Sequence, residues 1–258
     1  MLKRVSNKIK RNIYFFILNL FSTFSKYSTG IESVLVGTSY GCWKLPEMYK
    51  KLNLSGVCLT GGVGEDLSFE YDLANNTALA FKLYDFTPRS KEYFENLVYS
   101  HNSGNLINAE GILLEPKNFD INRFEFIPKG LTLDSKNIEF YPPINPVHVS
   151  FSSIKNGNEP IIFPTLKLND VINKIEIDNR SILKLDIEGS EYELLKDHIT
   201  NASIFTFDIV LLELDYLRYC SLIEGFVYLS TLFKNSHNYK LFYIDGYNVG
   251  FIKNNLLE

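Results

Sequence analysis

The chain has 258 residues, of which 45% are hydrophobic and 22% charged, so it can bury a large core and is not disordered as a whole. Its net charge of −4 offers no basic footprint for a nucleic-acid backbone, and we expect no nucleic-acid partner. The cysteines, Cys42, Cys58 and Cys220, fit neither a CxxC metal site nor a disulfide framework. We interpret them as reduced thiols of a cytoplasmic protein.

Residues 1–30 differ from the rest of the chain. Basic residues precede a short apolar run at 13–21: Lys3, Arg4, Lys8, Lys10 and Arg11. A membrane-spanning helix needs ~20 apolar residues, and this run has half that length. Residues 22–30 contain no convincing signal-peptide cleavage site. Two interpretations stay open: residues 1–28 lie on an anionic membrane surface as an amphipathic helix, or they form a helix packed on the domain itself or on a partner.

From residue 31 onward, the hydrophobic pattern alternates between short strands and helices. It predicts strands at 31–36, 57–59 and 80–84, and helices at 46–52, 66–75 and from Pro88 onward. Residues 111–163 carry short apolar pieces between proline- and asparagine-rich turns. We interpret this segment as a β-rich insertion of strands or hairpins that shapes a substrate site.

A small strand–helix passage at 166–175 leads back to regular alternation at residue 181. We expect strands at 182–186 and 208–213, helices at 190–198 and 217–235, and a closing hairpin at 239–252. Strands that alternate with helices form parallel sheets covered on both faces. The sequence therefore predicts one α/β domain over residues 31–258, with a mostly parallel, doubly wound sheet that ends in an antiparallel hairpin.

The most informative segment is a glycine-rich turn between an apolar strand and a helix. Gly61, Gly62 and Gly64 let the backbone approach a ligand closely. Asp85 lies 21 residues after Gly64, at the end of the next predicted strand. An acid in this place can accept hydrogen bonds from both hydroxyls of a ribose. This arrangement predicts a nucleotide-binding crevice.

Two features of the same turn argue against NAD or FAD. Leu67 stands where a dinucleotide fingerprint has its third glycine. Glu65 and Asp66 place negative charge at the helix start, where a pyrophosphate would need bare backbone amides. A cationic or neutral ligand, such as the sulfonium and amino-acid end of S-adenosylmethionine, tolerates these acids.

Three acids follow predicted strands at the carboxyl edge of the sheet. Asp186 ends one strand, Glu188 comes in the following loop, and Glu213 ends the next apolar strand. These carboxylates can serve as a base, as a substrate clamp, or as oxygen ligands of a divalent cation. Their spacing does not choose among these roles, and we assign no residue as a metal ligand.

These motifs resemble the FkbM-type methyltransferases. Residues 185–195, Leu-Asp-Ile-Glu-Gly-Ser-Glu-Tyr-Glu-Leu-Leu, are similar to the family's Asp-Ile-Glu-Gly-Ala-Glu-aromatic helix start. Residues 60–70 resemble a subgroup's nucleotide loop, and 85–88 and 211–214 resemble two of its strand ends. The resemblance covers residues 33–253. It implies a class I, Rossmann-like, S-adenosylmethionine-dependent fold, of which a closing antiparallel hairpin is typical, and methyl transfer to a hydroxyl of a sugar or natural product.

Carried over by position, the resemblance implies a cofactor site made of Gly61, Gly62, Gly64, Glu65, Asp85, Phe86 and Asp186. The sequence also departs from the family. Leu59 and Thr60 stand where the first strand usually ends in an acid, and Phe86 replaces a proline. Asp215 stands where the family often has a histidine, which raises the alternative of weakened catalysis.

Methyl transfer is an in-line displacement at a sulfonium carbon, so catalysis depends on positioning and on removing the acceptor's proton. The candidate bases are Asp186, Glu188 and His148, which lies in the predicted insertion. Our leading hypothesis is an S-adenosylmethionine-dependent O-methyltransferase for a small molecule or glycan. The alternatives are a non-catalytic binding or scaffold module that docks through residues 1–28, and a nucleotide-sugar- or NAD-dependent enzyme.

Overall fold

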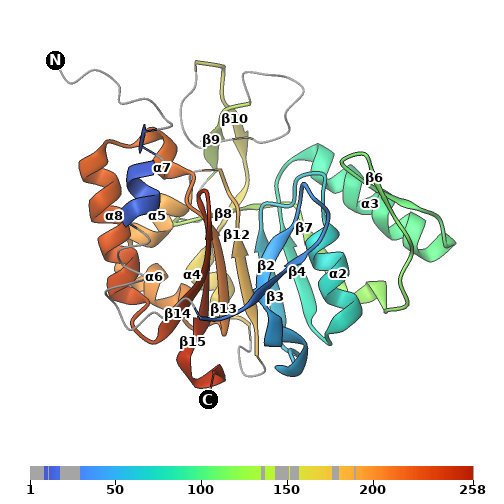
Figure 1. Ribbon diagram of the computed structural model, residues 1–258. Helices are drawn as coiled ribbons and strands as arrows, with labels where there is room; N and C mark the ends of the chain where they lie inside the picture. The colour runs from blue at the N-terminus through green and yellow to red at the C-terminus, as the bar shows by residue number, and fades with distance from the viewer. Residues whose placement is uncertain are drawn as a thin grey trace.

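The computed structural model describes residues 9–10, 12–17, 30–134, 137–142, 151, 157–175, 180–188 and 190–257. Its centre is a seven-stranded sheet in the order β14–β15–β13–β12–β3–β4–β7 (Figure 1). The strands are β3 (Val57–Gly61), β4 (Ala80–Tyr84), β7 (Phe124–Ile127), β12 (Ile182–Leu185), β13 (Ile209–Glu213), β14 (Tyr239–Asp245) and β15 (Asn248–Lys253). The first five run parallel, and β14 and β15 form an antiparallel hairpin. The predicted mostly parallel sheet and its closing hairpin are therefore confirmed.

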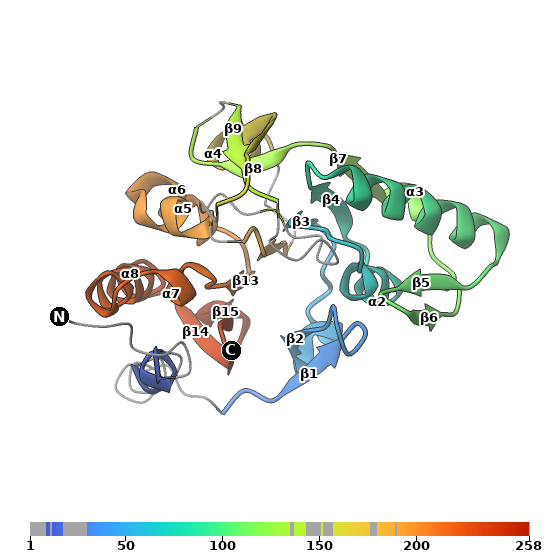
Figure 2. The same ribbon diagram turned by 90° about the horizontal axis from the view of Figure 1, so that it is seen from above.

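Helices lie on both faces of this sheet, as the view from above shows (Figure 2). One side holds α4 (Leu168–Ile172), α5 (Glu191–Lys196), α6 (His198–Ile204) and α8 (Leu222–Asn235), with the short α7 (Tyr216–Tyr219) before α8; the other side holds α2 (Ser68–Asn76) and α3 (Pro88–Ser103). Leu183 and Leu185 of β12 pack into the first core, and Ile182 packs into the second. A strand covered on both faces is apolar along most of its length, which explains the nearly continuous hydrophobic runs of the sequence.

An antiparallel hairpin of β1 (Ser33–Val36) and β2 (Trp43–Pro46) precedes the sheet and leads into the 3-10 helix η1 (Glu47–Lys51). The sequence predicted the first strand and a helix after Pro46, but not the second strand. Four residues that end in a proline are too short to give a clear period-two pattern.

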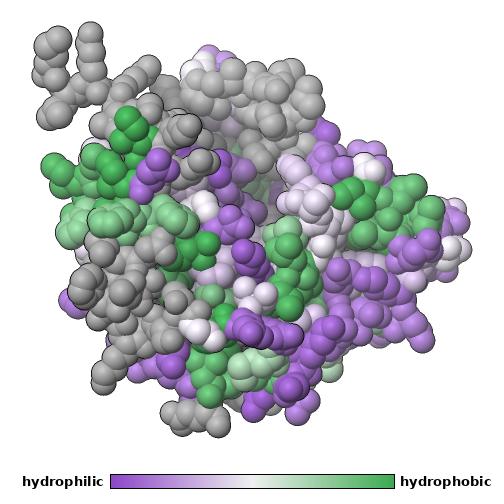
Figure 3. All heavy atoms as spheres, in the orientation of Figure 1, coloured by the Kyte–Doolittle hydropathy of each residue, from purple (hydrophilic) through white to green (hydrophobic). Residues whose placement is uncertain are grey.

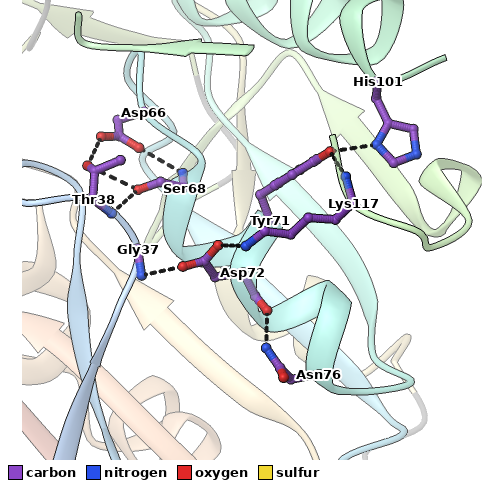
Figure 4. A network of polar contacts seen from close by, with 9 residues as sticks. All are labelled: Gly37, Thr38, Asp66, Ser68, Tyr71, Asp72, Asn76, His101 and Lys117. Carbon is purple, nitrogen blue, oxygen red and sulfur yellow. Dashed lines mark hydrogen bonds and ion pairs between the residues drawn. The ribbon is translucent and has the colours of Figure 1, made fainter. Parts of the chain in front are cut away.

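The turn of this hairpin is fixed to the start of α2 by a polar network (Figure 4). The backbone amide of Thr38 donates to Ser68 Oγ at 2.7 Å, and its hydroxyl donates to Asp66 Oδ2 at 2.7 Å. The Gly37 amide donates to Asp72 Oδ2 at 3.1 Å. Because Asp66 and Ser68 directly follow the glycine-rich turn, this network also fixes the hairpin turn relative to that loop.

The predicted β-rich segment 111–163 contains short strands, and one of them belongs to the main sheet. β7 pairs in parallel with β4 at the sheet edge, although the sequence pattern suggested an insertion there. The others form small pairs, two of them with a strand just outside the segment: β6 (Ile112–Leu114) with β5 (Ile107–Ala109), β8 (Gly130–Thr132) with β11 (Thr165–Lys167), and β9 (Ile138–Phe140) with β10 (Ile161–Phe163). The 3-10 helix η2 (Ile121–Arg123) precedes β7, and η3 (Asn254–Leu256) follows β15.

The described part of the N-terminal segment, residues 9–10 and 12–17, is helical. Its Tyr14 is buried, and the hydroxyl donates to the carbonyl of Ser221 at 3.1 Å, just before α8. This helix therefore packs on its own domain, as one of the two interpretations of the sequence requires. No helix in the described ranges is both long and apolar enough to span a membrane.

Candidate functional site

A cavity of about 300 Å³ lies at the carboxyl ends of β3, β4, β12 and β13. The β1–β2 turn, the glycine-rich turn after β3, the end of β4 and the loop after β12 form its walls. Of the residues that the sequence assigned to the site, the cavity is lined by Gly62, Gly64, Glu65, Asp85, Phe86, Asp186, Glu188 and Glu213. Gly61 ends β3 directly beneath this turn, and His148 lies outside the described residues.

Glycine stands at two positions of the turn for two different physical reasons. Gly62 has a φ of 84°, and a Cβ there would lie 1.7 Å from the carbonyl oxygen of Asp186. The loops after β3 and β12 thus touch through their backbones, and the Asp186 amide also donates to Gly61 O at 2.9 Å. Gly64 has a φ of 60° and no atom within 4 Å of its Cβ position. Gly62 therefore joins two loops, whereas Gly64 leaves room on the cavity side.

The carboxylate of Asp85 braces the glycine-rich turn. Its Oδ2 accepts from the amides of Val63 at 2.9 Å and Gly64 at 3.2 Å. Its Oδ1 accepts from the amide and the hydroxyl of Thr87, both at 2.8 Å. A carboxylate has about four acceptor positions, so Asp85 is well satisfied although it is almost fully buried. The sequence predicted its place at the site but not this contact with the turn.

The wall near β4 combines an ion pair with an aromatic cluster. Glu65 faces Arg89 at the start of α3, and the guanidinium donates to both carboxylate oxygens, at 2.7 and 3.2 Å. Phe86 packs against Phe140 and Phe163, with ring centroids 4.0 and 4.5 Å apart. Phe86 and Phe140 therefore give the cavity an aromatic wall beside Asp85.

The acids behind the glycine-rich turn form a connected group. The Glu213 carboxyl hydrogen bonds to Asp186, and burial, followed by the negative charge of Asp186, raises the pKa of Glu213 to about 12. Arg218, 2.8 Å from Glu213 Oε1, opposes this shift but is itself partly exposed. Glu213 is therefore protonated at neutral pH and donates to Asp186.

Glu188 and Asp215 extend this group toward α7. Asp215 hydrogen bonds to Glu188, and Arg218 Nε lies 2.7 Å from Asp215 Oδ1. Burial raises the pKa of Asp215, and Arg218 counteracts it. Glu188 has a φ of 53°, a left-handed conformation that is uncommon for glutamate. Residues held in such conformations cluster at functional sites.

Metal binding by these acids was a subsidiary hypothesis of the sequence analysis. Within the ranges that the structure describes, no group of three or more His, Cys, Asp or Glu side chains is arranged to hold a metal ion. The acids instead engage one another and Arg218. Among the described residues, these side chains therefore do not fit a divalent cation.

Sequence reasoning missed Lys184, a buried ammonium group that lines the cavity. It pairs with the fully buried Glu70 at 3.3 Å and lies 5.6 Å from the ring centre of Trp43. Burial lowers the pKa of Lys184, but the charges of Glu70 and Asp186 outweigh it, so the net shift is upward. The available signal was a single charged residue inside an otherwise apolar strand.

Glu70, the partner of Lys184, also accounts for one departure from the family pattern. Thr60 stands in β3 where the family usually has an acid, and its hydroxyl donates to Glu70 Oε1 at 2.9 Å. Glu70 of α2 thus places a carboxylate beside the end of β3, which has no acid of its own. Tyr40, Cys42, Trp43 and Asn248 also line the cavity.

Comparison with known proteins places this geometry in a family. The model of the methyltransferase FkbM domain matches residues 56–240. This range contains the glycine-rich turn, Asp85 and the acid group of Asp186, Glu188, Glu213 and Asp215. A search of curated proteins and a search of solved structures gave no match. The β1–β2 turn and β15 contribute to the cavity from outside the matched region. The chain belongs to the FkbM methyltransferase family.

Proposed function

We propose that the protein is an S-adenosylmethionine-dependent O-methyltransferase of the class I, Rossmann-like, doubly wound type, acting on a hydroxyl of a sugar or other small molecule. The place of the cavity carries this proposal. From β3 the chain builds the sheet outward through β4 and β7, and it then returns to the other side of β3 with β12 and β13. Ligands of open α/β sheets bind at such a switch point, and the cavity lies at the carboxyl ends of β3 and β12.

The residues present fit the proposed cofactor. The open side of Gly64 leaves room for a ligand at the backbone, Asp85 braces the turn that would face the cofactor, and Phe86 lines the cavity where adenine would pack. Glu65, Asp66, Asp85, Asp186 and Glu188 all line the cavity. This excess of acids suits a ligand that carries a positively charged sulfur and an ammonium group.

The cofactor would supply an electrophilic methyl group, and the chain's own residues would position the acceptor and remove its proton. We assign the base to Asp186, which lines the cavity and accepts a hydrogen bond from the protonated Glu213. That bond orients the carboxylate and leaves its other oxygen for the acceptor hydroxyl. Glu188, held by Asp215, would bind the acceptor beside it.

The test is transfer of a labelled methyl group from S-adenosylmethionine to compounds in an extract of the host, with products identified by mass spectrometry. The proposal predicts labelled products with the wild-type protein and none with Asp186→Asn, even at S-adenosylmethionine concentrations that saturate this variant. Wild-type protein that binds the cofactor but labels no hydroxyl compound would favour the non-catalytic module. Equal labelling by Asp186→Asn would exclude Asp186 as the base.

A further inference from the structure

The β1–β2 turn presents an exposed aromatic side chain to the cavity. Tyr40 lines the cavity and is 68% exposed. The turn that carries it is firmly held, because the hydroxyl of Thr38 accepts from the amides of Tyr40 at 3.3 Å and Gly41 at 3.1 Å. A Cβ on Gly41 would lie 2.4 Å from Asp66 Cγ, so the turn packs directly against Asp66. An aromatic ring on such a rigid support binds a ligand at a low cost in conformational entropy.

The β1–β2 hairpin also reaches the closing hairpin of the sheet. It lies between α2 and the β14–β15 hairpin (Figure 2), and Lys44 Nζ of β2 lies 3.6 Å from Asp245 Oδ2 at the end of β14. Asn248, the first residue of β15, lines the same cavity as Tyr40. Figure 3 shows hydrophilic residues over the surface between the two hairpins. Because β15 and β4 lie on opposite sides of β3, the cavity has a β4 end and a hairpin end.

The groups around the hairpin end are rich in hydrogen-bond acceptors. The carboxylates of Asp186 and Glu188 line the cavity. Burial raises the pKa of Tyr40, and the charges of nearby acids raise it further, among them those of Asp186 and Glu188. Asn248 adds an amide whose Oδ1 is buried and has no hydrogen-bond partner in the part of the chain that the structure describes. The fold therefore does not use this oxygen, and a half-turn of the amide exchanges its oxygen and nitrogen.

Resting on the methyl transfer proposed above, we infer that the hairpin end of the cavity holds the acceptor as a saccharide ring. Tyr40 stacks on the C–H face of the ring, and the amide of Asn248 binds a ring hydroxyl beside Asp186. A ring with an apolar face and several hydroxyl donors suits one aromatic platform surrounded by acceptors. A flat aromatic alcohol offers these acceptors a single donor. Tyr40 and Asn248 lie outside residues 56–240, so the choice of acceptor depends on elements that flank the family match.

Trp43, the single tryptophan of the chain, lines the same cavity and reports binding without methyl transfer. Its fluorescence is followed while the full chain, saturated with the demethylated cofactor S-adenosylhomocysteine, is titrated with the methyl glycosides of glucose, galactose, mannose and rhamnose. We expect a saturable change with at least one glycoside and none with benzyl alcohol. Tyr40→Ala should raise the dissociation constant about threefold to tenfold, and Tyr40→Phe, which keeps the ring, by less than about twofold. Asn248→Ala should raise it about threefold to tenfold as well.

The matched control is Tyr99→Ala in α3, which removes a tyrosine that is also 68% exposed but lies away from the cavity. It should bind the glycoside as the wild type does. Circular dichroism verifies that each variant is folded. Calorimetry with S-adenosylmethionine separates this inference from the proposed function, because the wild-type protein and every variant should bind the cofactor with the same affinity.

A wild-type protein that binds the cofactor but responds to none of the four glycosides would overturn the inference and leave the proposed function standing. The same conclusion would follow if benzyl alcohol bound in place of the glycosides, or if Tyr40→Ala or Asn248→Ala bound the glycoside unchanged. A loss of cofactor affinity in Tyr40→Ala equal to its loss of glycoside affinity would assign the turn to the cofactor instead. Wild-type protein that does not bind the cofactor would contradict the proposed function, and this inference with it.

Discussion

The carboxyl group of Glu213, at the end of β13, hydrogen bonds to Asp186, the first residue after β12. Neighbouring parallel strands bring the two acids to the same edge of the sheet, and their shared proton keeps both charges from being present at once. Carboxyl pairs of this kind separate the roles of acid and base at one site. This pair is the chemical centre of the proposed mechanism.

Glu213→Gln should stabilise the protein at alkaline pH. Because the pKa of Glu213 is raised, the folded state keeps a proton that the unfolded state releases above about pH 4.3. The unfolded state therefore binds fewer protons, and stability falls as pH rises, by at most about 1.4 kcal/mol per pH unit. Glutamine keeps a donor toward Asp186 without this dependence. Thermal melts should show a larger gain at about pH 8.5 than at about pH 5.

The exposed residue Glu95 provides the control for this experiment, since Glu95→Gln removes a surface acid that pairs with Lys91 in α3. It should shift the melting temperature equally little at both pH values. If Glu213→Gln and wild type had parallel melting profiles across this range, Glu213 would not carry the shared proton.

Gly62→Ala should destabilise the fold far more than Gly64→Ala. The new methyl group at position 62 would overlap the Asp186 carbonyl, so the loops after β3 and β12 would have to separate. We expect a loss above about 3 kcal/mol, against about 1 kcal/mol for the left-handed backbone alone at position 64. Urea denaturation measures both values. Equal losses in the two variants would show that the loops after β3 and β12 do not touch.

Lys184→Met should cost about 3–5 kcal/mol, because it leaves the Glu70 carboxylate buried without its partner. The double variant Glu70→Gln/Lys184→Met removes both charges and should recover part of this loss. A double-mutant cycle from urea denaturation gives the coupling between the two side chains. Additive losses would mean that the two charges do not depend on each other.

Methyl transfer should not depend on a divalent cation. The acids of the site are occupied by hydrogen bonds and by Arg218, and the described residues do not form a metal-ligand group. Turnover should therefore be the same with and without EDTA. Activity that EDTA abolishes and Mg²⁺ restores would contradict this description of the site.

The sequence predicted the alternation of strands and helices, the closing hairpin and the positions of the site acids, because hydrophobic period and strand-end residues are local signals. It did not predict β2 or the parallel pairing of β7, since both strands are short and flanked by turn residues. The contacts of Asp85 with the Val63 amide and of Glu213 with Asp186 join residues far apart in the chain. Such pairings depend on the finished sheet, so no local pattern reveals them.

Cofactor binding tests the central claim most directly. In isothermal titration calorimetry with S-adenosylmethionine, the wild-type protein should bind one molecule, and Asp85→Ala should bind at least about tenfold more weakly, because it loses the brace of the glycine-rich turn. Tyr99→Ser, distant from the cavity, should bind as the wild type does. If the wild-type protein gave no binding heat with S-adenosylmethionine, this result would contradict the assignment of the cavity to that cofactor.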